Sequence, residues 1–341
     1  MHMTSALRAT RLSILDRSRV RDGQPHPEAL RETVEFGRLA QEWGYHRFWV
    51  SEHHSVPGVA GSAPTVLAAA IAGATDRIRV GTGGVMLPNH QPLVVAEQFG
   101  TLEALYPGRI DMGLGRSVGF TDGVRRALGR GKDDAEDFDA QLTELLEYFA
   151  RGRNGVHAWP AEGLRVPAYL LATGSGAQRA ARFGLPLVIA AVSGEDAMIE
   201  AIGNYRRDFH ATEWGSAPYV IVSASVVIAD TVEQAHRLLL PEAWSAAYSR
   251  TRGEFPALIS PDRIDREPMT ERQRRIFEDS LRGHIHGPES TVIPALESLV
   301  THTGADEILV HTSTFDRTAR LESHRRLAAA VLAGAAAPAL A

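Results

Sequence analysis

The chain has 341 residues, of which 44% are hydrophobic and 23% charged, and this composition is typical of a globular protein. Its formal net charge of −5 indicates no basic surface for nucleic acid or for an anionic membrane, so neither is expected as a partner. The absence of cysteine excludes disulfides, thiolate metal sites and a cysteine nucleophile, and it fits a reducing cytoplasm. We find no signal-peptide pattern and no long uninterrupted apolar stretch, so we expect a cytoplasmic protein.

Short apolar segments alternate with helical patterns along most of the chain. Eight strands separated by helices indicate parallel βαβ units, and eight strands close a (β/α)8 TIM barrel, so the expected fold class is α/β. No GxGxxG motif follows the first strand, which argues against an open dinucleotide-binding sheet. The predicted strands are residues 12–16, 47–51, 77–82, 110–114, 169–172, 187–191, 219–229 and 308–310. The predicted helices are residues 27–43, 63–74, 93–105, 138–149, 176–183 and 321–332, with another that ends near Tyr205.

Residues 241–287 interrupt this alternation, because the segment is rich in proline and in charged residues. We interpret it as an insertion between the seventh strand and its helix, and long insertions of this kind often form lids over binding sites. The last residues, 333–341, are of low complexity and are predicted to be disordered. The whole chain, 1–341, is otherwise expected to form a single barrel domain.

The segment FWVSEHH at residues 48–54 combines an apolar strand with a carboxylate and two imidazoles at its end. In a (β/α)8 barrel the residues just past the strand ends form the active-site face. Imidazole is the side chain best suited to moving protons near neutral pH, so His53 and His54 are candidate catalytic residues. The alternative is that these histidines are ordinary polar groups at the start of a loop.

The third and fourth strands also end in residues that could contact a ligand. Gly83-Gly84 would let the backbone approach a planar ligand closely, although a tight turn explains two glycines equally well. Arg116 follows the fourth strand, where its guanidinium could bind a phosphate or carboxylate, or form a surface ion pair. Arg109 and Asp111 lie at the opposite end of that strand, so we expect them to be structural.

The fifth strand is followed by Thr173, Gly174 and Ser175, which open a helix. Backbone N–H groups at a helix N-terminus bind anions, although simple capping by a hydroxyl would use the same residues. Together, the ends of strands two to five fit a phosphate-bearing planar cofactor at the barrel mouth. The pair His284 and His286 could suggest a metal, but its position in the chain and the lack of other ligand motifs argue against one, so no metal is predicted.

Four segments together resemble the bacterial luciferase-like flavin monooxygenase superfamily, most closely its antibiotic-biosynthesis-associated branch. They are WVSEHH, IRVGTGGVMLPNHQP, ALYPGRIDMGLGRS and GADEILVHT, and the resemblance extends over about residues 12–332. It implies a TIM barrel that uses reduced FMN and O₂ to oxygenate a small organic substrate through a flavin C4a-hydroperoxide. It also implies a separate flavin reductase as partner and a homodimer.

The resemblance assigns a role to each candidate position. His53 matches the catalytic histidine, Gly83 and Gly84 match a cis peptide beneath the flavin ring, and Arg116 matches an arginine that binds the flavin phosphate. Thr173, Gly174 and Ser175 match the phosphate turn. Gly115 stands where luciferase has a reactive cysteine, and the turn lacks luciferase's carboxylate, so light emission is not implied.

Two other functions fit the same residues. Related barrels transfer hydride with the deazaflavin F420, and the same anion-binding turns would hold that cofactor. A protein that binds flavin without catalysis is the second alternative. The sequence does not identify the organic substrate.

Overall fold

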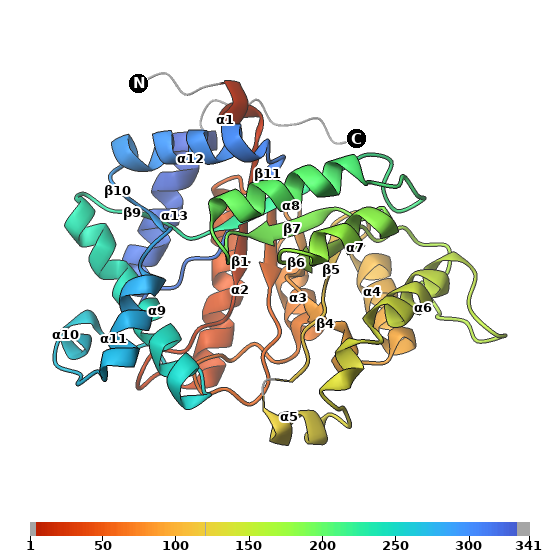
Figure 1. Ribbon diagram of the computed structural model, residues 1–341. Helices are drawn as coiled ribbons and strands as arrows, with labels where there is room; N and C mark the ends of the chain where they lie inside the picture. Colours follow the sequence, from red (N-terminus) through yellow and green to blue (C-terminus); the bar gives the residue numbers. More distant parts are fainter. Residues whose placement is uncertain (1–4, 120, 333–341) are drawn as a thin grey trace.

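In the computed structural model, which describes residues 5–119 and 121–332, eight parallel strands form a closed barrel (Figure 1). The barrel closes because β3 pairs with β5, at Val80–Ile110 and Gly81–Asp111. Each predicted strand overlaps one of the eight, so the (β/α)8 TIM-barrel prediction is confirmed. The barrel strands are β1 (Arg11–Asp16), β2 (Arg47–Val50), β3 (Arg79–Thr82), β5 (Ile110–Gly115), β6 (Ala168–Ala172), β7 (Leu187–Ala190), β8 (Val220–Ala224) and β11 (Glu307–Val310).

Apolar side chains cover both faces of these strands, which is why the strands appear in the sequence as continuous hydrophobic runs. Successive side chains point to opposite faces of a strand. In β2, Phe48 and Val50 pack outward against the helices, while Trp49 points into the barrel. The inward residues form a separate apolar cluster that fills the barrel, made of Trp49, Tyr169, Val188, Ile221 and Leu309.

Helices surround the barrel, and several begin where the sequence supplies a proline. Pro64 and Pro92 are the first residues of α3 and α4, a position that needs no backbone N–H. Within the described ranges, no helix combines the length and the apolar character needed to cross a membrane. The short α1 (Ser5–Ala9) lies beside α12 at the N-terminal end of the barrel (Figure 1). The surrounding helices are α2 (His26–Glu42), α3 (Pro64–Gly73), α4 (Pro92–Leu105), α6 (Phe138–Ala150), α7 (Gly176–Phe183), α8 (Glu195–Arg207), α12 (Glu289–Thr303) and α13 (Arg317–Leu332).

Short elements at the C-terminal end of the barrel were not expected from the sequence. β4 (Val85–Met86) and a 3₁₀ turn, η1 (Leu87–Asn89), follow β3, and β4 pairs with the last residues of β5. Another helix, α5 (Asp122–Ala127), and a second 3₁₀ turn, η2 (Asp133–Ala135), separate β5 from α6. Neither α5 nor η2 buries a residue, so neither produces the apolar periodicity that would reveal it in the sequence.

The predicted seventh strand, residues 219–229, is in fact two strands. β8 ends at Ala224, and β9 (Val226–Ile228) leaves the barrel to pair with β10 (Ile285–Gly287). The side chain of Thr312 causes the break, because its hydroxyl accepts from the N–H of Val226 at 2.9 Å and donates to the carbonyl of Val226 at 2.7 Å. These bonds replace those that a neighbouring barrel strand would make.

The helical segment between β9 and β10 begins before Pro241, contrary to the predicted boundary. Pro241 is a buried residue inside α9 (Val232–Arg252), where the helix gives up one backbone hydrogen bond but continues. α10 (Pro261–Ile264) and α11 (Glu271–Ser280) pack against α9, and the three helices lie together at one side of the barrel (Figure 1). The predicted disordered tail, 333–341, lies outside the described residues.

Buried charges close the N-terminal end of the barrel. Asp111 accepts from the Nη1 of Arg47 at 2.8 Å, from the Nη2 of Arg79 at 2.7 Å and from the indole Nε1 of Trp49 at 3.0 Å. The Nε of Arg47 also lies 2.7 Å from a carboxylate oxygen of Glu307. Burial alone would raise the pKa of Asp111, but Arg47 and Arg79 hold it below its ordinary value. The structural role expected for Asp111 is therefore confirmed.

The same end of the barrel confirms the structural role of Arg109. Its guanidinium donates to the carbonyls of Ala72, at 2.8 Å, and Ile78, at 3.3 Å, and to the hydroxyl of Thr75, at 3.2 Å. These bonds tie the start of β5 to the end of α3 and to the loop that precedes β3.

Candidate active site

A cavity of about 1040 Å³ opens at the C-terminal ends of the barrel strands. Its walls come from the loops after β2, β3, β5 and β6, together with residues from the strands and from the segment after α9. This is the end at which TIM-barrel enzymes place their active sites. Gly174 is not among the lining residues, although both of its neighbours are. The predicted residues that line the cavity are His53, Gly83, Gly84, Arg116, Thr173 and Ser175.

The position of His53 is set by its own loop and by an aromatic neighbour. Its backbone N–H donates to the carbonyl of Gly61 at 2.9 Å, and its Nδ1 lies 3.2 Å from the hydroxyl of Ser51. The edge of the ring meets Phe255, with ring centroids 6.1 Å apart. Because Nδ1 is used by Ser51, Nε2 is the nitrogen left for a ligand.

The surroundings of His53 favour the neutral imidazole. Burial, followed by the positive charges of Arg17 and Arg19, lowers the pKa of His53 to about 4. At neutral pH the ring is therefore uncharged, and one of its nitrogens can accept a proton. That is the state required of a general base.

Glu52, which precedes His53, is a buried carboxylate that joins two loops. It accepts from the Nε2 of His54 at 2.7 Å, from the Nε2 of His90 at 2.9 Å, and from the N–H of Met86 at 2.9 Å. Burial alone would raise the pKa of Glu52, but the bonds from His54 and His90 lower it to about 2. Glu52 thus fixes the loop after β2, which carries His53, to the loop after β3.

The side-chain atoms of Glu52, His54 and His90 that could coordinate a metal ion all lie within 4.8 Å of one another. As they stand, each imidazole is hydrogen-bonded to the carboxylate, so the three groups satisfy one another without an ion. His284 and His286 do not join them, because their ring nitrogens bond to the carbonyls of Ser280 and His284. Sequence reasoning missed the triad because Glu52 and His90 are far apart in the chain.

The two glycines after β3 form a flat part of the cavity wall. The Gly83–Gly84 peptide bond is cis, which confirms the conformation expected there. A Cβ atom at Gly83 would lie 2.7 Å from the Cδ1 of Leu15, and one at Gly84 would lie 2.7 Å from the carbonyl oxygen of Gly113. A Cβ at Gly84 would collide with backbone, and one at Gly83 would displace the side chain of Leu15, so both positions disfavour a side chain and leave backbone facing the cavity.

The other side of the cavity is basic on balance, because four cations line it beside two acids: Arg116, Arg125, Lys132 and Arg179 with Asp133 and Glu136. Arg116 is exposed, and its Nε donates to the carbonyl of Ala135 at 2.9 Å. In the turn before α7, Gly174 has a positive φ of 50°, and Ser175 makes no side-chain bond that caps the helix. The capping role considered for Ser175 is therefore not observed. Lys132, the single lysine of the sequence, also lines this side.

These two walls together fit a planar cofactor that carries a phosphate. The glycine turn accepts a flat ring without side-chain interference, and the exposed guanidinium and the turn before α7 supply donors for an anion. FMN and F420 share both features, so the cavity fits either cofactor.

The chain belongs to the luciferase-like monooxygenase family, whose profile matches residues 10–307. It is 36% identical over 315 residues to a luciferase-like monooxygenase of Escherichia coli, covering 91% of this chain and 94% of that protein. It is 38% identical over 240 residues to the N-acetyl-S-alkylcysteine monooxygenase of Bacillus subtilis, covering 67% of this chain and 70% of that protein.

Solved structures agree with this assignment. The structure of apo-MsnO8 superposes with a TM-score of 0.85 at 32% identity, covering 96% of this chain and 98% of that one. The oxygenating constituent of 3,6-diketocamphane monooxygenase from Pseudomonas putida, in complex with FMN, has a TM-score of 0.73 at 18% identity, with 96% and 99% covered. An F420-dependent secondary alcohol dehydrogenase has a TM-score of 0.69 at 15% identity, with 94% and 99% covered. The last two likenesses show the fold alone.

Proposed function

We propose that this protein is an FMN-dependent monooxygenase that uses reduced FMN and O₂ to oxygenate a small organic substrate. The observation that carries the proposal is the single cavity that brings a neutral imidazole together with a side-chain-free glycine turn and a basic turn. Family membership supports monooxygenase chemistry, and the FMN-bound neighbour with the same fold supports the choice of cofactor.

The residues of the cavity would have separate roles in binding the cofactor, transferring a proton and excluding water. Gly83 and Gly84 would lie against the isoalloxazine ring, and Arg116 would bind the phosphate together with the turn Thr173–Ser175. Reduced FMN, when bound, supplies the electrons that activate O₂. His53 would accept or return a proton at Nε2, while Phe255 and the apolar barrel residues exclude water from the reaction.

The segment between β9 and β10 is the proposed lid, and it includes the predicted insertion 241–287. Phe255 belongs to this segment, contacts His53 and lines the cavity, so movement of the segment would open the site. Limited proteolysis with and without FMN tests the lid. Protection of residues 241–287 by FMN is expected, and equal cleavage in both samples would count against a lid.

Partners and substrate follow from the proposed reaction. The chain would receive reduced FMN from a separate flavin reductase and would act as a homodimer. An N-acetyl-S-alkylcysteine is the first substrate to test, because a relative that shares 38% identity is named for it. Hydride transfer with F420 is the alternative, and the F420-bound neighbour with the same fold supports it.

The decisive experiment is an anaerobic titration of the protein with photoreduced FMN, followed by mixing with oxygenated buffer and substrate. Tight FMN binding and substrate-dependent uptake of O₂ would support the monooxygenase. Substrate reduction by reduced F420 without O₂ uptake would replace it with the hydride-transfer enzyme. Tight FMN binding with neither activity would indicate a flavin-binding protein without turnover.

A further inference from the structure

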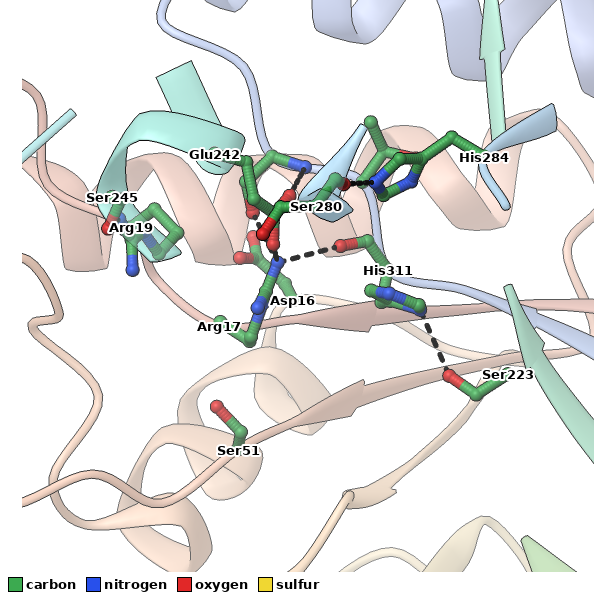
Figure 2. A network of polar contacts seen from close by, with 12 residues as sticks. Asp16, Arg17, Arg19, Ser51, Ser223, Glu242, Ser245, Ser280, His284 and His311 are labelled. Atoms are coloured by element: carbon green, nitrogen blue, oxygen red, sulfur yellow. Dashed lines mark hydrogen bonds and ion pairs between the residues drawn. The ribbon is translucent and has the colours of Figure 1, made fainter. Parts of the chain in front are cut away.

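Arginines and carboxylates lie together at the barrel mouth beside β1, where Figure 2 shows Arg17 and Arg19 with Asp16 and Glu242. Arg17 and Arg19 follow β1, and Arg17 forms an ion pair with Glu242 of α9. Arg19 instead donates to the hydroxyl of Ser245 at 2.6 Å and to the carbonyl of Pro256 at 3.3 Å. Across residues 5–119 and 121–332, no carboxylate forms an ion pair with Arg19, so its charge is not neutralised by the protein.

The carboxylate of Asp16, at the end of β1, is already engaged. Asp16 lies 3.4 Å from the guanidinium of Arg320 and accepts from the N–H of Ser18 at 2.7 Å and the hydroxyl of Thr33 at 3.3 Å. The ion pairs of Arg17 with Glu242 and of Arg320 with Asp16 use both acids. One positive charge therefore remains, on Arg19.

The two arginines also keep hydrogen-bond donors that the protein does not use. All side-chain hydrogen bonds of Arg17 and Arg19 come from Nη2. The Nε of each is buried and has no partner among the described residues. The Nη1 of each has no partner in the described part of the chain and is not among the buried atoms. The planar guanidinium can donate two parallel hydrogen bonds to a carboxylate. Both arginines therefore still have N–H donors available for one.

Neither arginine lines the cavity itself, but both lie close enough to His53, which does line it, to lower the pKa of that histidine. Pro256, which accepts from Arg19, directly follows Phe255 of the cavity wall, and Ser51 and Ser223 also line the cavity. Figure 2 shows Arg17 and Arg19 on one side of Ser51, with His311 directed at Ser223. β1 is four strands away from β6 in either direction around the barrel. The arginines and the turn at Thr173–Ser175 thus stand on opposite sides of the mouth.

The pKa values of two neighbouring histidines are lowered, chiefly because both imidazoles are buried. Burial first, and then Arg17, lowers the pKa of His311 to about 3. The pKa of His284 is lowered chiefly by burial, with smaller effects from His286 and Arg17. Neutral imidazoles add no positive charge, so the arginines alone define the charge that an anion would meet.

We propose that Arg19, with Arg17 beside it, binds the carboxylate of the organic substrate on the β1 side of the mouth. The inference rests on the proposed function, since it assigns the polar end of that substrate. A carboxylate at this place would neutralise Arg19 and accept from the free Nη1 groups. The remainder of the substrate would extend toward His53 and the glycine turn.

The test compares two probes that differ only at the carboxyl group, N-acetyl-S-benzyl-L-cysteine and its primary amide. Binding is measured by calorimetry on the full chain without cofactor. We expect the carboxylate to bind about 10- to 100-fold more tightly than the amide. Arg19→Gln should abolish that preference, whereas Arg282→Gln should keep it, because Arg282 is an exposed arginine paired with Asp279. Circular dichroism checks that each variant is folded.

Two further variants keep the test decisive if Arg19→Gln does not fold. Arg19→Lys retains the charge without the fork and should leave an intermediate preference. Glu242→Gln releases Arg17 from its ion pair and should tighten carboxylate binding, which a merely structural role for these arginines would not produce. Equal binding of acid and amide by the unmodified protein, binding of neither, or an unchanged preference in Arg19→Gln would overturn the proposal. FMN binding is titrated in parallel, so a carboxylate preference without FMN binding would refute only the proposed function.

Discussion

At the N-terminal end of the barrel, Arg47 and Arg79 lie among the carboxylates of Asp111 and Glu307, and the charges balance. At the C-terminal end, Arg17, Arg19 and Arg320 share two carboxylate partners among the described residues, those of Glu242 and Asp16. Both ends of the barrel therefore enclose arginines, but their charges are balanced by carboxylates only at the N-terminal end.

The comparison of the two ends distinguishes charges that stabilise the fold from charges that remain available to bind a ligand. A buried ion pair that loses one partner destabilises a protein strongly, so the balanced end should tolerate little change. An unbalanced charge already costs stability in the free protein, and its removal should be tolerated or even favourable. The following changes test this contrast, from the largest expected effect to the smallest.

Asp111→Asn should lower the free energy of unfolding by about 3–5 kcal/mol, because it leaves Arg47 and Arg79 without their shared carboxylate. Urea denaturation measures the change. Asp76→Asn is the matched control, since Asp76 is exposed and pairs only loosely with Arg77, at 3.7 Å. A loss no larger than that of the control would show that the buried pair is not what holds this end together.

His53→Ala should reduce the rate of substrate oxygenation by about a hundredfold or more, because a general base is lost. FMN affinity and the free energy of unfolding should change little. In the unmodified protein, activity should fall as the pH decreases through about 4, where His53 becomes protonated. A substrate-saturated rate within a few-fold of the unmodified protein would remove His53 from the mechanism.

Gly84→Ala should destabilise the protein by about 1–3 kcal/mol and weaken FMN binding, because its Cβ would lie 2.7 Å from the carbonyl oxygen of Gly113. Gly203→Ala is the control, since no atom lies within 4 Å of a Cβ at that helical position. FMN fluorescence quenching and thermal unfolding measure both effects. Equal behaviour of the two variants would contradict the role given to the glycine turn.

Glu52→Gln should lower the free energy of unfolding by about 1–2 kcal/mol at neutral pH, because the amide accepts more weakly from His54 and His90. The pKa of Glu52 is about 2 in the folded protein, below its unfolded value of about 4.3. Its ionised form therefore stabilises the fold fully above about pH 4.3, and this contribution is lost as the pH falls through 2. Urea denaturation from pH 7 downward should show the free energies of unfolding of the variant and the unmodified protein becoming equal. A difference that stays constant with pH would argue against the ionic contribution.

Arg19→Gln should lower the free energy of unfolding by no more than about 1 kcal/mol. The hydrogen bonds to Ser245 and to the carbonyl of Pro256 are lost, but within the described residues Arg19 has no carboxylate partner to lose, and an unpaired charge is removed. Thermal unfolding beside Asp111→Asn makes the comparison direct. A loss of several kcal/mol would mean that Arg19 belongs to the structural charges after all.

Much of the fold follows from the sequence because every barrel strand is buried on both faces and so leaves a continuous apolar run. The failures have local causes. The break after Ala224 depends on the side chain of Thr312, which is distant in sequence, and Pro241 lies inside a helix that tolerates it. α5 and η2 bury nothing and leave no pattern.

Most residues of the candidate site could be predicted from the sequence, because the C-terminal ends of parallel barrel strands all lie at the same end of the barrel. His53, the glycine turn, Arg116 and the turn before α7 therefore lie around one cavity. The sequence could not reveal which residues far apart in the chain contact one another. Glu52 meets His90 from another loop, and the isolation of Arg19 becomes visible only when all surrounding carboxylates are located.

The small sheet of β9 and β10 has a consequence for how this barrel can diversify. The end of β9 and the start of β10 lie within about 8 Å of each other, given the usual spacing and rise of strands. Because parallel strands need a crossover connection, about a dozen residues would be enough to join them, and the chain between β9 and β10 is much longer than that. The additional length supplies Glu242, Ser245 and Phe255 to the barrel mouth, so insertions or deletions away from these residues should leave the registers of the eight barrel strands unchanged.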